Sequence, residues 1–173
     1  MNSALLRISA AFAVAVCAAV PVPAAAQHRV GHAAMVYVSK AGAADLYEIQ
    51  ASQMATRRAR RPQVRDFAQM LIADHTHSTQ MVSEAAHSDG LDPRPPVLER
   101  SQRMMLRQLE AARDRDFDRL YLSQQIPAHV QGLALHRAYA RRGEGAALRR
   151  TAGEIVPVVE HHLARARELA RMR

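Results

Sequence analysis

Apolar residues recur at alternating steps of three and four along most of this chain, which is the spacing of one face of an α-helix. The clearest case is residues 146–172, where one apolar stripe has a single polar member, His162. That stripe comprises Leu148, Ala152, Ile155, Val159, His162, Ala166 and Leu169. Residues 32–56, 62–87 and 114–142 carry stripes of the same period, with no alternation typical of strands. The pattern therefore predicts an all-α protein with four long helices.

Glycine and proline mark the joints between these helices. Ser88-Asp89-Gly90 and the following proline-rich segment end the second helix, and Gly143 and Gly145 precede the last. Residues 97–112 between them have a helical composition, and Asp114 or Asp116 is a candidate N-cap for the next helix. A helix over 97–112 would return the chain along the bundle, so we predict a crossover helix between the second and third bundle helices. The two arginine groups, 57–65 and 137–150, then lie at opposite ends.

Pro127 and Pro157 fall inside the third and fourth long helices, where each removes one backbone donor. A proline in a helix interior is typical of a kink. We expect a kink in both helices.

Each stripe is interrupted near its midpoint by a residue that can bind a proton or a metal: Glu48, His75, His129 and His162. A buried polar group without a partner costs about 1–3 kcal/mol. Helices stacked in one bundle would hold these four side chains at the same height. The sequence therefore predicts a polar site inside the bundle, whereas His161, one step off its stripe, should face outward.

The N-terminal residues 1–26 have the pattern of a cleavable signal peptide. Arg7 supplies the positive charge, an apolar run of thirteen residues follows, and Ala24-Ala25-Ala26 gives a small-residue cleavage site. The only cysteine, Cys17, lies inside this segment, so cysteine metal sites and thiol catalysis are excluded for the mature chain. We expect a periplasmic or otherwise exported domain over residues 27–173, with no transmembrane anchor after cleavage.

Charge bears on the partners of the chain. The 24 basic and 16 acidic residues give a net charge of +8, and removal of Arg7 leaves +7. This charge favours anionic components of the cell envelope. Nucleic acid is a poor candidate because aromatic residues do not alternate with the basic ones and the chain carries an export signal.

Several residue pairs along the chain carry a resemblance to a known family. They are Val64-x-x-Phe67-Ala68, Asp74-His75, Phe117-Asp118-x-x-Tyr121, Ile126-x-x-His129 and Pro157-x-x-x-x-His162-Leu163. In this order they resemble the exported bacterial family called domain of unknown function 4142, over nearly all of the mature chain. The resemblance implies a ferritin-like four-helix bundle in the periplasm or envelope and no established reaction. Asp114 and Pro127 depart from the family pattern.

Ferritin-like bundles often hold two metal ions with a glutamate on each of two helices and Glu-x-x-His on each of the other two. That set is incomplete here because the last helix offers only Val159-x-x-His162. A single ion held by His75, His129, His162 and either Glu48 or Asp74 fits the residues better, and iron, zinc and copper suit such ligands. The alternative, which we favour from the sequence, is a hydrogen-bonded cluster without metal.

The function predicted from these features is ligand or partner binding in envelope maintenance or stress response, without turnover. No Gly-rich phosphate loop, Gly-x-Ser-x-Gly elbow or His-Glu-x-x-His motif is present. The alternative function is a metal-dependent redox or metal-storage protein that uses the central site. Copper binding by Met70, Asp74, His77 and Met81 on one face of the second helix is a weaker hypothesis, since methionines at this spacing are usually core residues.

Overall fold

A computed structural model describes residues 24–172, with side chains from residue 31 onward, and all of its regular elements are helices. They are α1 (Ala24–Arg58), α2 (Pro62–Ser88), α3 (Arg100–Ala111), α4 (Asp114–Arg142) and α5 (Ala146–Arg171). The all-α prediction is confirmed. The predicted signal peptide lies outside the described residues, apart from its last three alanines at the start of α1.

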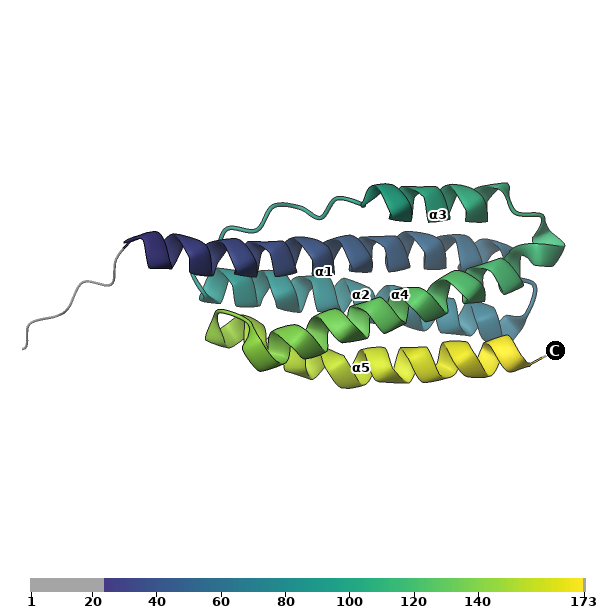
Figure 1. Cartoon of the computed structure of the whole chain (residues 1–173). Coiled ribbons are helices and arrows are strands. Elements are labelled where there is room, and N and C mark those ends of the chain that lie inside the picture. Colours follow the sequence, from purple (N-terminus) through teal and green to yellow (C-terminus); the bar gives the residue numbers. More distant parts are fainter. Residues whose placement is uncertain (1–23, 173) are drawn as a thin grey trace, which may run out of the picture.

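The four long helices lie side by side along their lengths (Figure 1). Each packs against two neighbours, in the order α1, α2, α5, α4 and back to α1, and α3 packs on the outside against α1 and α4. This closed arrangement leaves a common interior in which the apolar stripes meet. None of the described helices combines the length and hydropathy that a membrane crossing requires.

The chain between α2 and α4 runs back along the bundle, so that α2 and α4 point the same way (Figure 1). Contacts at the two ends agree with this direction. Asp89, after α2, accepts hydrogen bonds from the backbone of Ala147 and Leu148 at the start of α5. Arg61, before α2, donates to the carbonyl of Leu169 near the end of α5. The two arginine groups therefore lie at opposite poles, as the crossover predicts.

The crossover helix is shorter than predicted. Residues 97–99 are not helical, and α3 begins at Arg100, after Glu99 and Gln102 form a capping box. The preceding Pro95-Pro96 holds the chain extended, which delays the helix. The prediction that Asp114 or Asp116 caps α4 is wrong, because the N-cap is Arg113 and makes no side-chain capping bond. Both aspartates lie in the first helical turn instead, where their charge suits the helix dipole.

Helices α4 and α5 continue through Pro127 and Pro157 without a break, and both prolines are exposed. The ring of each proline therefore faces solvent rather than the interior of the bundle.

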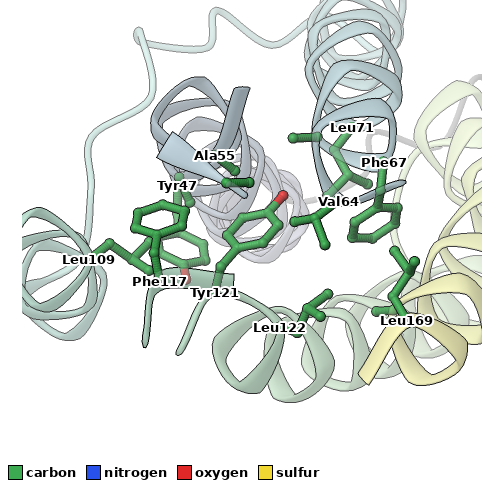
Figure 2. Packing of buried hydrophobic residues seen from close by; sticks show 14 of the residues in the cluster. Tyr47, Ala55, Val64, Phe67, Leu71, Leu109, Phe117, Tyr121, Leu122 and Leu169 are labelled. Atoms are coloured by element: carbon green, nitrogen blue, oxygen red, sulfur yellow. The ribbon is translucent and has the colours of Figure 1, made fainter. Parts of the chain in front are cut away.

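Buried apolar side chains form two separate clusters along the bundle. The first contains Phe67, Leu71, Phe117 and Tyr121 (Figure 2) and lies toward the α1–α2 connection, since it includes Ala59 and Val64. The second lies toward the α4–α5 connection and contains Val82, Leu133, Ile155 and Val159, among others. Between the two clusters lie the polar members of the stripes, among them His75, His129 and His162. The core is thus divided by a polar layer at mid-height.

Candidate metal centre

Three histidines from three helices meet in the polar layer. His75 comes from α2, His129 from α4 and His162 from α5, and all three are buried. Their ring centroids are 5.3–5.6 Å apart. One ring nitrogen of each lies within 4.8 Å of one nitrogen of both others. The structure thus brings together the three imidazoles that the stripes place at one level.

Each histidine is held through one of its two ring nitrogens. Nδ1 of His75 is 2.8 Å from Oδ1 of Asp45, and Nε2 of His162 is 2.8 Å from Oδ2 of Asp74. Nδ1 of His129 is 2.9 Å from the backbone carbonyl of Gln125, which can only accept. Each anchored nitrogen therefore carries the hydrogen, which leaves a lone pair on the other nitrogen of a neutral ring.

The second nitrogen of every ring is buried and has no hydrogen-bond partner among the side chains that the structure describes. These atoms are Nε2 of His75, Nε2 of His129 and Nδ1 of His162. Leaving a buried polar atom unpaired costs about 1–3 kcal/mol. One nitrogen from each ring lies within 4.8 Å of the others, and ligating nitrogens around a tetrahedral zinc ion lie about 3.3 Å apart, so the rings need to approach by at most about 1.5 Å. The donor set therefore fits a single metal ion.

The partner of His75 is Asp45, not the neighbouring Asp74. Successive residues on a helix point about 100° apart, so Asp74 and His75 face different helices. Asp74 faces α5 and holds His162, while Asp45 on α1 holds His75 and also accepts a bond of 3.1 Å from Thr79. Asp74 is in contact with the cluster as a hydrogen-bond acceptor.

Glu48 lies at the edge of the cluster. Its Oε1 is 3.8 Å from Nδ1 of His129, and its Oε2 is buried without a partner. Burial raises the pKa of Glu48 to about 7, against the opposing effects of His75 and Gln125. The carboxyl group is therefore partly protonated at neutral pH.

The pKa values of the three histidines are shifted in opposite directions. Burial lowers the pKa of His129 to about 3 and that of His162 to about 4. Burial also opposes the charged form of His75, but the hydrogen bond and charge of Asp45, helped by Glu48 and Asp74, raise its pKa overall. At neutral pH two of the three imidazoles are thus neutral, the form that binds metals.

A pocket of about 460 Å³ reaches the cluster from the side of α1, α3 and α4. His75, His129 and Glu48 form part of its wall, and the exposed residues Lys40, Glu99 and Gln131 also line it. Much of the remaining wall is small or apolar: Ala44, Ala128, Gly132, Leu135 and Val159. The interior site is therefore connected to the surface through this pocket.

Sequence reasoning missed the residues that surround the histidines. Asp45 lies three positions before Glu48, on the same face of α1, and this spacing was the available signal. His136 is also buried and lies seven positions after His129, with its Nδ1 3.0 Å from the hydroxyl of Tyr37. The outward position of His161 was predicted correctly, since it is exposed. His77 is also exposed and is not a member of the three-histidine group.

Comparisons with known proteins agree with this architecture. The sequence model described as "Domain of unknown function (DUF4142)" matches residues 19–169, so the chain belongs to that family and the predicted resemblance is confirmed. No curated protein matches the chain.

Two solved structures share the fold. One, "CopM in the Cu(I)-bound form", has a TM-score of 0.67 at 17% identity and covers 78% of this chain and 93% of its own. The other is a DUF305 fragment from Deinococcus radiodurans, with a TM-score of 0.68 at 16% identity, covering 80% of this chain and 96% of its own. At these identities the similarity is one of fold.

Proposed function

We propose that this member of the DUF4142 family binds one transition-metal ion through His75, His129 and His162. The observation that carries the proposal is the set of three buried, unpartnered ring nitrogens. Each belongs to a ring whose other nitrogen is already held by Asp45, Gln125 or Asp74. Metal-binding histidines in proteins are held in the same way, by a carboxylate or a carbonyl on the second nitrogen.

In this proposal the two carboxylates named from the sequence have different roles. Asp74 orients His162, whereas Glu48 stands beside the histidines. Three imidazoles suit zinc and copper better than iron, which prefers more carboxylate oxygens. The fold shared with CopM, whose solved structure is the Cu(I)-bound form, adds support for testing copper first.

The proposed setting is the periplasm or envelope, as the sequence of residues 1–26 suggests. A metal-binding role there would serve storage, buffering or redox protection. The role favoured from the sequence, partner binding without metal, leaves the three buried nitrogens without a partner among the described side chains and is for that reason the weaker hypothesis here.

The test is metal analysis of the purified mature chain after exposure to zinc, copper and iron in turn. We expect about one equivalent of zinc or copper, retained through dialysis. His162→Gln should bind the metal at least about 100-fold more weakly, because one ligand is lost. His161→Gln is the matched control, since it removes the exposed neighbouring imidazole and should bind like the wild type. Absence of metal from the wild-type chain, or equal binding by the two variants, would refute the proposal.

A further inference from the structure

The metal proposed above would face the pocket on one side only. His75 and His129 line the pocket, whereas His162 does not. A metal ion held among the three nitrogens would thus lie with His162 behind it and the pocket in front. Three protein ligands are also the number that catalytic zinc sites use when a fourth position is kept for a water or substrate.

Glu48 is placed to contact whatever occupies that position. Its Oε2 is buried, has no partner in the described part of the chain, and belongs to a residue of the pocket wall. Its other oxygen lies 3.8 Å from Nδ1 of His129, the anchored nitrogen, and Glu48 is not a member of the group of close ligand atoms. A carboxylate so placed is an acceptor for a hydrogen on a bound ligand.

The shape and charge of the pocket limit the ligand. Its volume of about 460 Å³ exceeds what a few waters need and falls within the range of small-molecule sites. Three acidic residues, Asp45, Glu48 and Glu99, line it against one cation, Lys40. A divalent metal ion would bring these formal charges to about zero, so the pocket offers an anion no net attraction and a neutral donor suits it better.

We propose that the metal keeps one coordination position open to this pocket, where it binds a small neutral nitrogen or oxygen ligand whose hydrogen is accepted by Glu48. The inference rests on the proposed function, since it requires the metal. It assigns Glu48 as a positioning residue for the exogenous ligand rather than as a fourth metal ligand.

Imidazole is the probe, because it has a neutral donor nitrogen and an N–H on the opposite side of a small apolar ring. Azide is the anionic comparison. Calorimetry on the zinc-loaded chain and visible absorption of the cobalt-loaded chain should both show saturable binding of imidazole, at least about 10-fold tighter than that of azide. Metal content is measured after each titration, so that extraction of the metal is not mistaken for binding.

Two variants separate the contributions of the pocket and of Glu48. Ala44→Leu adds bulk to the pocket wall and should retain the metal but lose imidazole binding, whereas Ala33→Leu, at an exposed position of the same helix, should bind like the wild type. Glu48→Met removes the acceptor at similar size. It should keep one equivalent of metal and weaken imidazole about 10-fold, the effect of one lost hydrogen bond.

The outcomes distinguish this inference from the proposed function. A wild-type chain that binds no metal refutes both. Metal binding with no response to imidazole, or with azide preferred, overturns the inference and leaves the metal site intact. Loss of the metal in Glu48→Met would instead make Glu48 a ligand, and equal imidazole binding by Ala44→Leu and Ala33→Leu would exclude this pocket as the binding position.

Discussion

Asp45 holds His75 in the cluster, although it belongs to a different helix. It is buried, accepts a hydrogen bond from Thr79, and fixes the ring of His75 so that Nε2 points away from α1. The carboxylate also makes the imidazole a stronger donor to a metal. An amide at this position would keep the size of the side chain but lose the charge.

We therefore predict that Asp45→Asn weakens metal binding about 10–100-fold while the chain stays folded. The measurement is a competition titration against a chelator of known affinity, with circular dichroism to confirm the helical content. Asp66→Asn, an exposed carboxylate on α2, is the control and should have no effect. An Asp45→Asn variant with wild-type affinity would show that His75 does not need this anchor.

At this scale the sequence was informative only where the pattern was periodic. His75, His129 and His162 could be predicted because each replaces an apolar residue in a stripe. Their partners could not, because a hydrogen bond between α1 and α2 depends on the rotation of each helix about its axis. The periodicity does not determine that rotation to better than about one residue, or roughly 100°.

At the scale of the elements, the N-terminus of α5 is capped by a residue that lies outside this helix. The cap position is Gly145, which has a positive φ of 82° and no side chain that could cap the helix. The backbone amides of Ala147 and Leu148 in the first turn donate to the carboxylate of Asp89, which follows α2. The aspartate thus acts as a capping group supplied from the residue after α2, and it ties that end of α2 to α5.

Asp89→Ala should lower the free energy of unfolding by about 1–2 kcal/mol, the usual cost of a lost helix cap. Gly145→Ala should also destabilise, because a Cβ there would lie 2.2 Å from the carboxylate of Asp89 and the backbone has a positive φ. Urea unfolding followed by circular dichroism measures both. Asp92→Ala, an exposed aspartate three residues away, is the control; if it costs as much as Asp89→Ala, the cap explanation is wrong.

The bounds of the long helices followed from glycine, proline and the stripes, and the structure places them within a few residues of the prediction, apart from the earlier start of α1. The short helix was predicted less well. Its composition is helical from residue 97, but Pro95 and Pro96 act on the residues beside them. The steric effect of the two prolines therefore decides where α3 begins, despite the helical composition of residues 97–99.

For the molecule as a whole, the buried titratable groups make stability depend on pH. His129, His136 and His162 have pKa values lowered to between about 3 and 4, chiefly by burial, against an ordinary value of 6.5. The unfolded chain therefore binds more protons than the folded chain between these values, so stability falls as the pH falls below about 6.5. Glu48 acts in the opposite sense between pH 7 and 4.5, because its pKa is raised to about 7.

On unfolding near pH 5.5, the three histidines each take up about one proton and Glu48 releases about one. The net uptake is therefore about two protons. We expect the metal-free chain to lose roughly 2–3 kcal/mol per pH unit between pH 6 and 5. Denaturant unfolding at closely spaced pH values measures this slope. In His136→Gln the slope should decrease by about one proton, because one buried histidine is gone. A stability that is flat from pH 7 to 5 would contradict the prediction.

Counting the crossover, the chain passes along the bundle five times, an odd number. Helix α1 consequently starts at one pole and α5 ends at the other (Figure 1). With about 1.5 Å per residue, a 27-residue helix such as α2 measures about 40 Å. Proteins fused before α1 and after α5 would therefore be separated by roughly the length of the bundle.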